Sequence, residues 1–252
     1  MVLLLNVGCF KGVKRGPACV AKDLASDGFI VLAIDYRGDC RSHALVGQVC
    51  LAYSPEYLQS QISDVRKAII AARTGTVADP NGTVISGRID GKVGGVGGSA
   101  GASHVLWCAI TGTPNSDKFD AAVLLSGIYE FDDANSLGDS HFSSDVDRYC
   151  RTNPTDPSRI THLPTGSPVY AITSAAVVPP LYFFATAQDT ATPSQYADLK
   201  TKLMSVGATN VRSLLLPLAD EDHNHAFEYW CTMNGATTVA QKVKTWLHGK
   251  LP

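Results

Sequence analysis

The sequence GGVGGSAGAS, from Gly94 to Ser103, fits two motifs that belong to different folds. Residues 95–100 read GVGGSA, which matches the G-x-G-x-x-G/A loop that binds dinucleotides. Residues 97–101 read GGSAG, which matches the G-x-S-x-G turn that presents a nucleophilic serine between a strand and a helix. The surrounding sequence therefore has to distinguish a cofactor loop from a nucleophile turn.

The positions of the neighbouring elements favour the nucleophile turn. A dinucleotide loop normally opens the first strand-helix-strand unit, and an acidic residue follows about 20 residues later at the end of the next strand. Here the glycines lie in the third such unit, and Asp120 precedes the next strand instead of ending it. An apolar strand before Gly97 and a helical pattern over Ala102–Ile110 satisfy the turn motif. We predict that Ser99 is a nucleophile, with a plain turn or an NAD-binding loop as alternatives.

Short apolar runs alternate with helical patterns along the chain, which is typical of parallel strands joined by crossover helices. With 252 residues, of which 45% are hydrophobic, the chain is long enough for one domain, 1–252, with a large core. We predict an α/β fold with helices on both faces of a mostly parallel sheet. The six expected strands are Val2–Val7, Phe29–Tyr36, Lys92–Gly97, Ala121–Ser126, Leu181–Ala187 and Val211–Pro217. The expected helices are Pro17–Ser26, Ser54–Ile70, Ala102–Ile110, Pro193–Val206 and Thr237–His248.

Two connections, Arg37–Tyr53 and Ile128–Val178, are longer than loops in compact domains usually are, and such loops often carry function. The second is rich in Asp, Ser, Thr and Pro and has no long periodic pattern. We interpret residues 128–178 as a lid-like excursion that covers the site.

The charge of the chain argues against several classes of partner. The formal net charge is -2 and no run of Lys or Arg occurs, so neither nucleic acid nor an anionic membrane is expected as a partner. No apolar stretch reaches the length of a membrane span, and the first residues lack the features of a signal peptide. A leader or earlier strands are either lost or absent, which leaves a cytoplasmic and a secreted location open.

Seven cysteines are an odd number, so at least one thiol is free or pairs between chains. In an oxidising compartment Cys40 could pair with Cys50, and Cys150 with Cys231. Scattered apolar thiols in a reducing cytosol are an equal alternative.

A nucleophilic serine needs a base, and the base needs a carboxylate that orients it. Asp189 directly follows the fifth expected strand, and Thr192 is better placed than Asp189 to cap the next helix. His225 follows the last strand and precedes Ala-Phe, which allows its ring to turn inward over a packed side chain; His223 is the second choice. We predict the triad Ser99, Asp189 and His225.

A metal site at the same loop is a weaker hypothesis. His223 and His225 with Asp220 and Asp222 offer suitable ligands, but no second cluster completes a tetrahedral set, so we expect no metal. An acyl-transfer site also needs N–H donors for the oxyanion, and the amide of Ala100, directly after the serine, is one of them.

Motifs spread over nearly the whole chain support the hydrolase interpretation. They are IDYR at 34–37, SDVR at 63–66, GGSAG at 97–101, LSGIY at 125–129, SP at 167–168, Asp189, and HAF at 225–227. With these motifs the chain resembles serine carboxylesterases of the α/β-hydrolase fold, nearest to small esterases related to hormone-sensitive lipase and to feruloyl and acetyl-xylan esterases. The resemblance implies a small-molecule ester substrate, an acyl-enzyme and no cofactor.

The chain departs from that family in two places. Such esterases usually carry His-Gly-Gly-Gly where this chain has NVGC at 6–9; the resemblance implies that the amides of Gly8 and Cys9 are the other oxyanion donors. The family also has an antiparallel hairpin before the strand that begins here at Val2. Without it the sheet would expose an edge at Phe29–Tyr36, which a loop or a second copy in a homo-oligomer could cover.

The resulting hypothesis is a serine carboxylesterase acting on small or short-acyl esters. An arylformamidase or another small amidase would use the same triad. A non-catalytic, hydrolase-like binding protein is the alternative that the altered oxyanion loop suggests.

Overall fold

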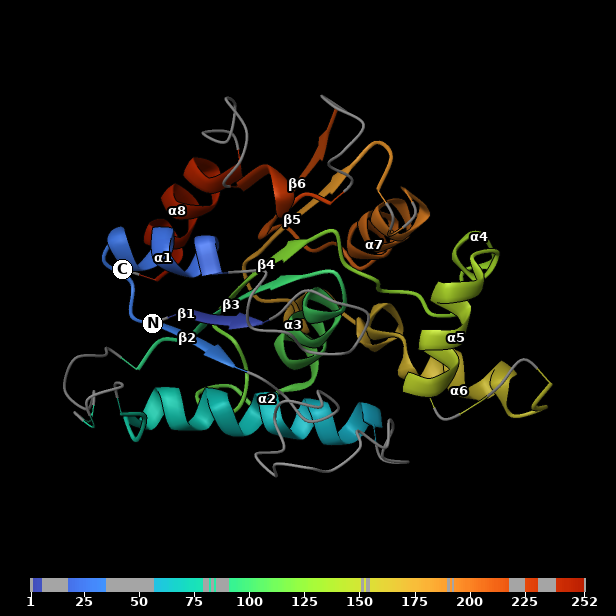
Figure 1. Cartoon of the computed structure of the whole chain (residues 1–252), viewed down its shortest axis with the longest axis horizontal. Coiled ribbons are helices and arrows are strands. Elements are labelled where there is room, and N and C mark those ends of the chain that lie inside the picture. Colours follow the sequence, from blue (N-terminus) through green and yellow to red (C-terminus); the bar gives the residue numbers. More distant parts are fainter. Residues whose placement is uncertain are drawn as a thin grey trace, which may run out of the picture.

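A six-stranded parallel sheet organises the part of the chain that the structure, a computed structural model, describes (Figure 1). The described residues are 2–5, 18–34, 57–78, 82, 84, 91–150, 152, 155–189, 191, 193–217, 225–230 and 239–251. The strands are β1 (Val2–Leu5), β2 (Val31–Ile34), β3 (Gly94–Gly98), β4 (Ala121–Leu125), β5 (Leu181–Thr186) and β6 (Val211–Leu216). Their order is β2-β1-β3-β4-β5-β6, and every neighbouring pair is parallel. The predicted α/β architecture is therefore confirmed, and the strand ends lie within two residues of their expected positions.

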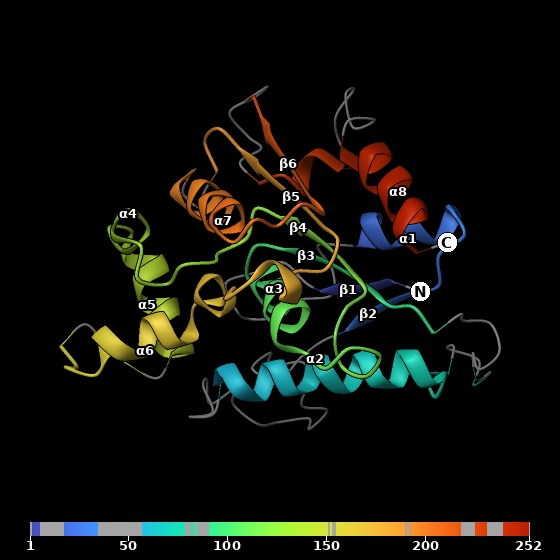
Figure 2. The same cartoon turned by 180° about the vertical axis from the view of Figure 1, so that it is seen from behind.

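Helices cover both faces of this sheet, as Figures 1 and 2 show from opposite sides. Helices α1 (Ala18–Ser26) and α8 (Val239–Lys250) pack on one face. The other face is covered by α2 (Tyr57–Thr74), α3 (Ala100–Thr111) and α7 (Pro193–Ser205). Within the described ranges, no helix is long and apolar enough to cross a membrane.

The central strands β3, β4 and β5 are buried at every residue, because helices cover both of their faces. Along β4, Val123 packs into the cluster with α1 and α8, whereas Leu124 packs into the cluster with α2, α3 and α7. Along β5, Phe184 packs into the cluster with α1 and α8, and Phe183 packs into the cluster with α2, α3 and α7. Successive side chains of a strand point to opposite faces, so a parallel sheet with two covered faces needs apolar residues at both.

The excursion between β4 and β5 contains short helices that have no long periodic pattern. They are α4 (Ala134–Leu137), α5 (Ser140–Tyr149), α6 (Arg159–Gly166), η1 (Pro168–Ala171) and η2 (Ala175–Val177). Figure 1 shows α4 to α6 on the side toward which the strands point. Phe131 and Tyr149 of this segment form a buried cluster with Ala100, the first residue of α3. The excursion therefore packs directly against the residue that follows Ser99.

A buried glutamine ties the start of the excursion to α7. Gln195 is 1% exposed, and its Oε1 accepts hydrogen bonds from the amides of Tyr129 (2.7 Å) and Glu130 (2.9 Å). Its Nε2 donates to the carbonyl of Glu130 at 2.7 Å. Because a buried amide side chain is costly unless it is hydrogen-bonded, this arrangement fixes the segment that leaves β4.

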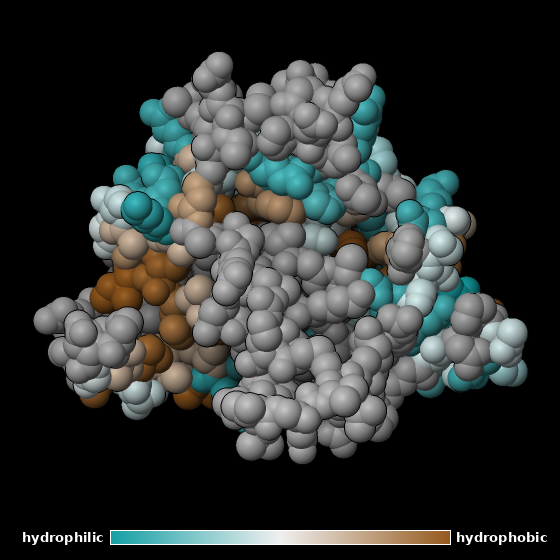
Figure 3. All heavy atoms as spheres, in the orientation of Figure 1, coloured by the Kyte–Doolittle hydropathy of each residue, from teal (hydrophilic) through white to brown (hydrophobic). Residues whose placement is uncertain are grey.

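β2 forms an edge of the described sheet, as expected for the range Phe29–Tyr36, of which residues 35 and 36 lie outside the described part. All four residues of β2 are half-buried. In Figure 3 apolar surface gathers on the side of the molecule that carries the two chain ends, near this edge. Among the described residues the sheet thus ends at β2, an apolar strand that pairs with β1 on one side.

The cysteines decide between the two alternatives at one position. Cys19 is disulfide-bonded, whereas Cys108 and Cys150 are buried free thiols, so the possible Cys150–Cys231 pairing is wrong and Cys150 fits the free-thiol alternative. Cys150 packs into the apolar cluster of the excursion, and its burial raises the pKa of its thiol to about 12. It acts there as a small apolar side chain. Cys40, Cys50 and Cys231 lie outside the described residues.

Candidate active site

Ser99 occupies a strained turn between β3 and α3. Its backbone has φ 50° and ψ −125°, a region that residues with a side chain rarely adopt. A Cβ atom on Gly97 would lie 2.4 Å from the carbonyl oxygen of Gly101, so the crossing of strand and helix requires glycine at 97. The amide of Ser99 donates to the carbonyl of Leu125 at 2.9 Å, which fixes the turn against β4. The local geometry is that of a nucleophile elbow.

The start of α3 can stabilise negative charge beside Ser99. Ala100 is the first residue of the helix, and the first amides of a helix have no partner within it. The hydroxyl of Ser99 does not cap α3, so it does not compete for these amides. The predicted donors Gly8 and Cys9 lie outside the described residues.

Asp189 follows β5 and its side chain is completely buried. Oδ1 accepts hydrogen bonds from Nδ1 of His225 (2.6 Å) and from the amide of Ala191 (3.1 Å). Oδ2 accepts from the hydroxyl of Ser126 and from the amide of Thr186 (3.1 Å). Four donors satisfy both oxygens, which is how a buried carboxylate is tolerated and held in one orientation.

His225 meets this carboxylate with one ring nitrogen and leaves the other available. Since a carboxylate only accepts hydrogen bonds, Nδ1 carries the proton and Nε2 is the basic nitrogen. The His225 side chain is 18% exposed, and its ring packs on Phe227 with centroids 5.0 Å apart, as the His-Ala-Phe motif predicted. The amide of His225 donates to Oε2 of Glu228 at 2.8 Å. His223 lies outside the described residues.

The ends of three adjacent strands bring these groups to one edge of the sheet. Ser99 follows β3, Ser126 follows β4 and Asp189 lies after β5. The amide of Ser126 donates a hydrogen bond to the carbonyl of Phe184 at 2.8 Å, in the same way as the amide of Ser99 donates to the carbonyl of Leu125. Ser126 belongs to the LSGIY motif at 125–129, for which the sequence alone predicts no site role. The signal in the sequence is a polar residue directly after a buried strand, as with Ser99.

His104, on the first turns of α3, belongs to a separate buried network. Its Nδ1 donates to the carbonyl of Ala100 at 2.7 Å, and its Nε2 lies 2.7 Å from the side-chain amide of Gln61 and 3.2 Å from the hydroxyl of Tyr149. Burial lowers the pKa of His104 to about 4, so the ring is neutral at pH 7. The ring thus joins α3 to α2 and α5 behind the elbow.

Asp120 has a structural role at the opposite edge of the sheet. Its Oδ2 accepts from the amide of Val93 at 2.7 Å and lies 2.9 Å from the guanidinium of Arg73. Asp120 precedes β4, so it lies away from the carboxyl ends of the strands, where a ribose would be bound. This arrangement argues against the dinucleotide alternative.

The described residues contain no group of three or more His, Cys, Asp or Glu side chains that could hold a metal ion. Of the four residues considered for a metal site, His225 is described and is engaged with Asp189. Asp220, Asp222 and His223 lie outside the described residues.

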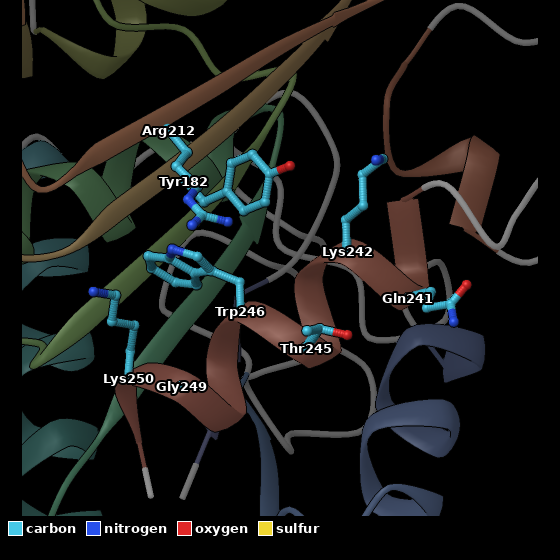
Figure 4. A pocket seen from close by; sticks show the side chains of 8 residues that line it. All are labelled: Tyr182, Arg212, Gln241, Lys242, Thr245, Trp246, Gly249 and Lys250. Carbon is cyan, nitrogen blue, oxygen red and sulfur yellow. The ribbon is translucent and has the colours of Figure 1, made fainter.

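An open groove between α8 and the amino ends of β5 and β6 is distinct from these groups (Figure 4). It is lined by Tyr182, Arg212, Gln241, Lys242, Thr245, Trp246, Gly249 and Lys250. Tyr182 is the second residue of β5, whereas Asp189 follows the end of that strand. The groove therefore lies at the edge of the sheet opposite Ser99.

The sequence matches no protein-family model and no curated protein. Solved structures do match the fold. An acetyl ester-xyloside bifunctional hydrolase from Caldicellulosiruptor lactoaceticus aligns over 98% of this chain and 82% of its own, with 16% identity and a TM-score of 0.68. Esterase B from Lactobacillus rhamnosis aligns over 98% and 75%, with 16% identity and a TM-score of 0.69.

A third match is esterase 2 from Thermogutta terrifontis in its form phosphoramylated by tabun. It aligns over 98% of this chain and 81% of its own, with 16% identity and a TM-score of 0.63. Together with the sheet order and the elbow, these similarities show that the chain has the α/β-hydrolase fold.

Proposed function

We propose that this chain, which has the α/β-hydrolase fold, is a serine carboxylesterase that hydrolyses small or short-acyl esters. The observation that supports this most strongly is the 2.6 Å contact between Asp189 and His225 at the edge of the sheet where Ser99 occupies its strained turn. An oriented imidazole and a serine hydroxyl at the same edge of the sheet are the two parts that acyl transfer requires.

In the proposed reaction the hydroxyl of Ser99 attacks the ester carbonyl. Nε2 of His225 takes the hydroxyl proton, while Asp189 keeps Nδ1 protonated and stabilises the imidazolium. The amide of Ala100 donates to the oxyanion, and the resemblance to esterases assigns Gly8 and Cys9 to the same task. The proton then passes from Nε2 to the leaving alcohol, which leaves an acyl group on Ser99.

Water completes the cycle by the same route. His225 removes a proton from the water as it attacks the acyl-enzyme, and returns that proton to Ser99 as the acid leaves. Each step is a proton transfer or an acyl transfer among the groups already named. The proposed reaction therefore needs no metal or cofactor.

Short acyl chains are the proposed substrate range. The similar hydrolase from Caldicellulosiruptor lactoaceticus is described as acting on an acetyl ester, and esterase B from Lactobacillus rhamnosis was solved with a tributyrin phosphonate inhibitor.

The test compares wild type with Ser99→Ala on p-nitrophenyl acetate, butyrate and octanoate, and on an N-formyl amide. We expect wild type to prefer acetate or butyrate, and Ser99→Ala to lose activity by about 10⁴-fold or more. Ser103→Ala is the matched control, because it removes another serine hydroxyl of the same segment. Faster cleavage of the amide would indicate an amidase. Retention of most activity by Ser99→Ala, or no turnover by wild type, would contradict the proposal.

A further inference from the structure

We propose that Ser126 is a positioning residue for this reaction, because its hydroxyl joins the acid to the loop that carries the base. The hydroxyl donates a hydrogen bond to Oδ2 of Asp189 and accepts one, at 2.7 Å, from the amide of Ala226. Ala226 is the next residue after His225. The inference rests on the proposed function, since it concerns the same Asp189–His225 pair.

The two oxygens of Asp189 have separate tasks. Oδ1 faces His225, while Oδ2 is held by the hydroxyl of Ser126 and the amide of Thr186. Fixing Oδ2 prevents the carboxylate from rotating, so Oδ1 stays directed at Nδ1 of the imidazole. Orientation of this kind lowers the entropy cost of reaching the reactive arrangement.

The same hydroxyl also holds the base from the other side. Ala226 is 0% exposed, so its amide would be an unsatisfied buried donor without Ser126. Because the amide nitrogen of Ala226 is bonded directly to the carbonyl carbon of His225, a shift of this amide also moves the imidazole. One hydroxyl thus sets the distance between the acid and the base.

The backbone of Ser126 indicates that its side chain has a use. Ser126 has φ 54°, in the left-handed region where glycine or asparagine is preferred and where other residues cost about 1 kcal/mol. It is also 1% exposed, so its hydroxyl has no access to bulk water. Glycine would avoid the backbone strain at this position, but it could not make the two hydrogen bonds of the Ser126 hydroxyl. These bonds are the simplest reason for a strained, buried serine here.

The experiment uses two substitutions of Ser126 and one matched control. Ser126→Ala removes the hydroxyl, and Ser126→Gly removes it and also relieves the backbone strain. Ser167→Ala is the control, because the hydroxyl of Ser167 also accepts from a backbone amide, that of Phe131 at 2.7 Å, and donates to the carbonyl of Leu163 at 2.7 Å. Ser167 is likewise fully buried but does not contact Asp189.

We expect Ser126→Ala and Ser126→Gly to lower kcat by about 10- to 100-fold while KM changes by less than about threefold. Ser167→Ala should leave kcat near the wild-type value. A second readout is the downfield ¹H NMR resonance of the Nδ1 proton that His225 shares with Asp189. This resonance should weaken or exchange faster in the Ala and Gly variants and persist in Ser167→Ala.

Two results separate this inference from the proposed function. If Ser99→Ala abolishes turnover but both hydroxyl-free variants keep wild-type kcat and the Nδ1 resonance, the role of Ser126 is wrong and the esterase proposal stands. If wild type has no turnover, the esterase proposal is wrong, and the resonance alone decides whether Ser126 holds the pair. Should Ser126→Ala fail to fold, Ser126→Gly carries the same test without the backbone strain.

Discussion

Nδ1 of His225 lies 2.6 Å from Oδ1 of Asp189, although the two residues are 36 positions apart in the sequence. The side chain of Asp189 is completely buried, whereas that of His225 is 18% exposed. The carboxylate is therefore fixed inside the protein while the imidazole reaches the surface. A base that exchanges protons with a bound substrate needs this combination of a rigid orienting group and an accessible ring.

Replacing the carboxylate by an amide should remove most of the activity without unfolding the protein. In Asp189→Asn the side chain can present an N–H to His225, which favours the wrong imidazole tautomer, and kcat should fall by about 10⁴-fold. The measurement is kcat on p-nitrophenyl acetate, with near-UV circular dichroism as a check of folding.

The surface pair of Asp27 and His248 provides the matched control for this substitution. Its Oδ2–Nε2 distance is 2.8 Å, and it joins α8 to the residue after α1. Asp27→Asn breaks a similar Asp–His contact outside the candidate site and should leave kcat unchanged. Equal loss of activity in both variants would point to stability and not to orientation of His225.

Gly97→Ala should destabilise the protein, because the new Cβ would lie 2.4 Å from the carbonyl oxygen of Gly101. Such a clash with backbone requires the strand or the helix to move, at a cost of about 2 kcal/mol or more. Gly249→Ala is the control: a Cβ there meets nothing within 4 Å, and alanine in α8 should gain up to about 1 kcal/mol. Urea unfolding of the two variants measures the difference, and equal stability would contradict the close packing at the elbow.

His104 should make the stability depend on pH. Burial lowers its pKa in the folded protein to about 4, whereas an exposed histidine titrates near 6.5. Between these values the unfolded chain binds a proton that the folded protein does not, so stability is lost as the pH falls from 6.5 toward 4. A shift of this size corresponds to about 3 kcal/mol.

The pH effect can be isolated by substitution. His104→Gln should shrink the difference between the unfolding free energies at pH 7 and pH 4.5, whereas His162→Gln, at an exposed position, should leave it unchanged. If His104→Gln retains the full wild-type difference, the neutral buried state of His104 is wrong.

The sequence was sufficient to predict the sheet and the order of the candidate groups. Apolar runs reveal strands that are covered on both faces, and the strand ends then locate Ser99, Asp189 and His225. The preference for His225 over His223 came from the Phe that follows it, and Phe227 does pack against the ring. Each of these features depends on residues close together in the sequence.

Other features depend on contacts that no local pattern contains. The proposed role of Ser126 depends on contacts between the ends of three strands and the segment that carries His225. In one of these contacts, Ser126 and Ala226 are 100 residues apart in the sequence. The helices of the excursion are short and are held by individual groups, such as Asp133, whose carboxylate accepts from the amides of Asn135 and Ser136. For Cys150 the sequence leaves a disulfide and a free thiol open, and the structure shows a free thiol buried in an apolar cluster.

The most direct test of the central claim is covalent labelling by a fluorophosphonate probe, followed by mass spectrometry of the modified peptide. The account predicts one modified residue, Ser99, with labelling absent in Ser99→Ala and much slower in Asp189→Asn. Folded wild-type protein that remains unlabelled, or that carries the phosphonate on a different residue, would contradict the assignment of Ser99 as the nucleophile.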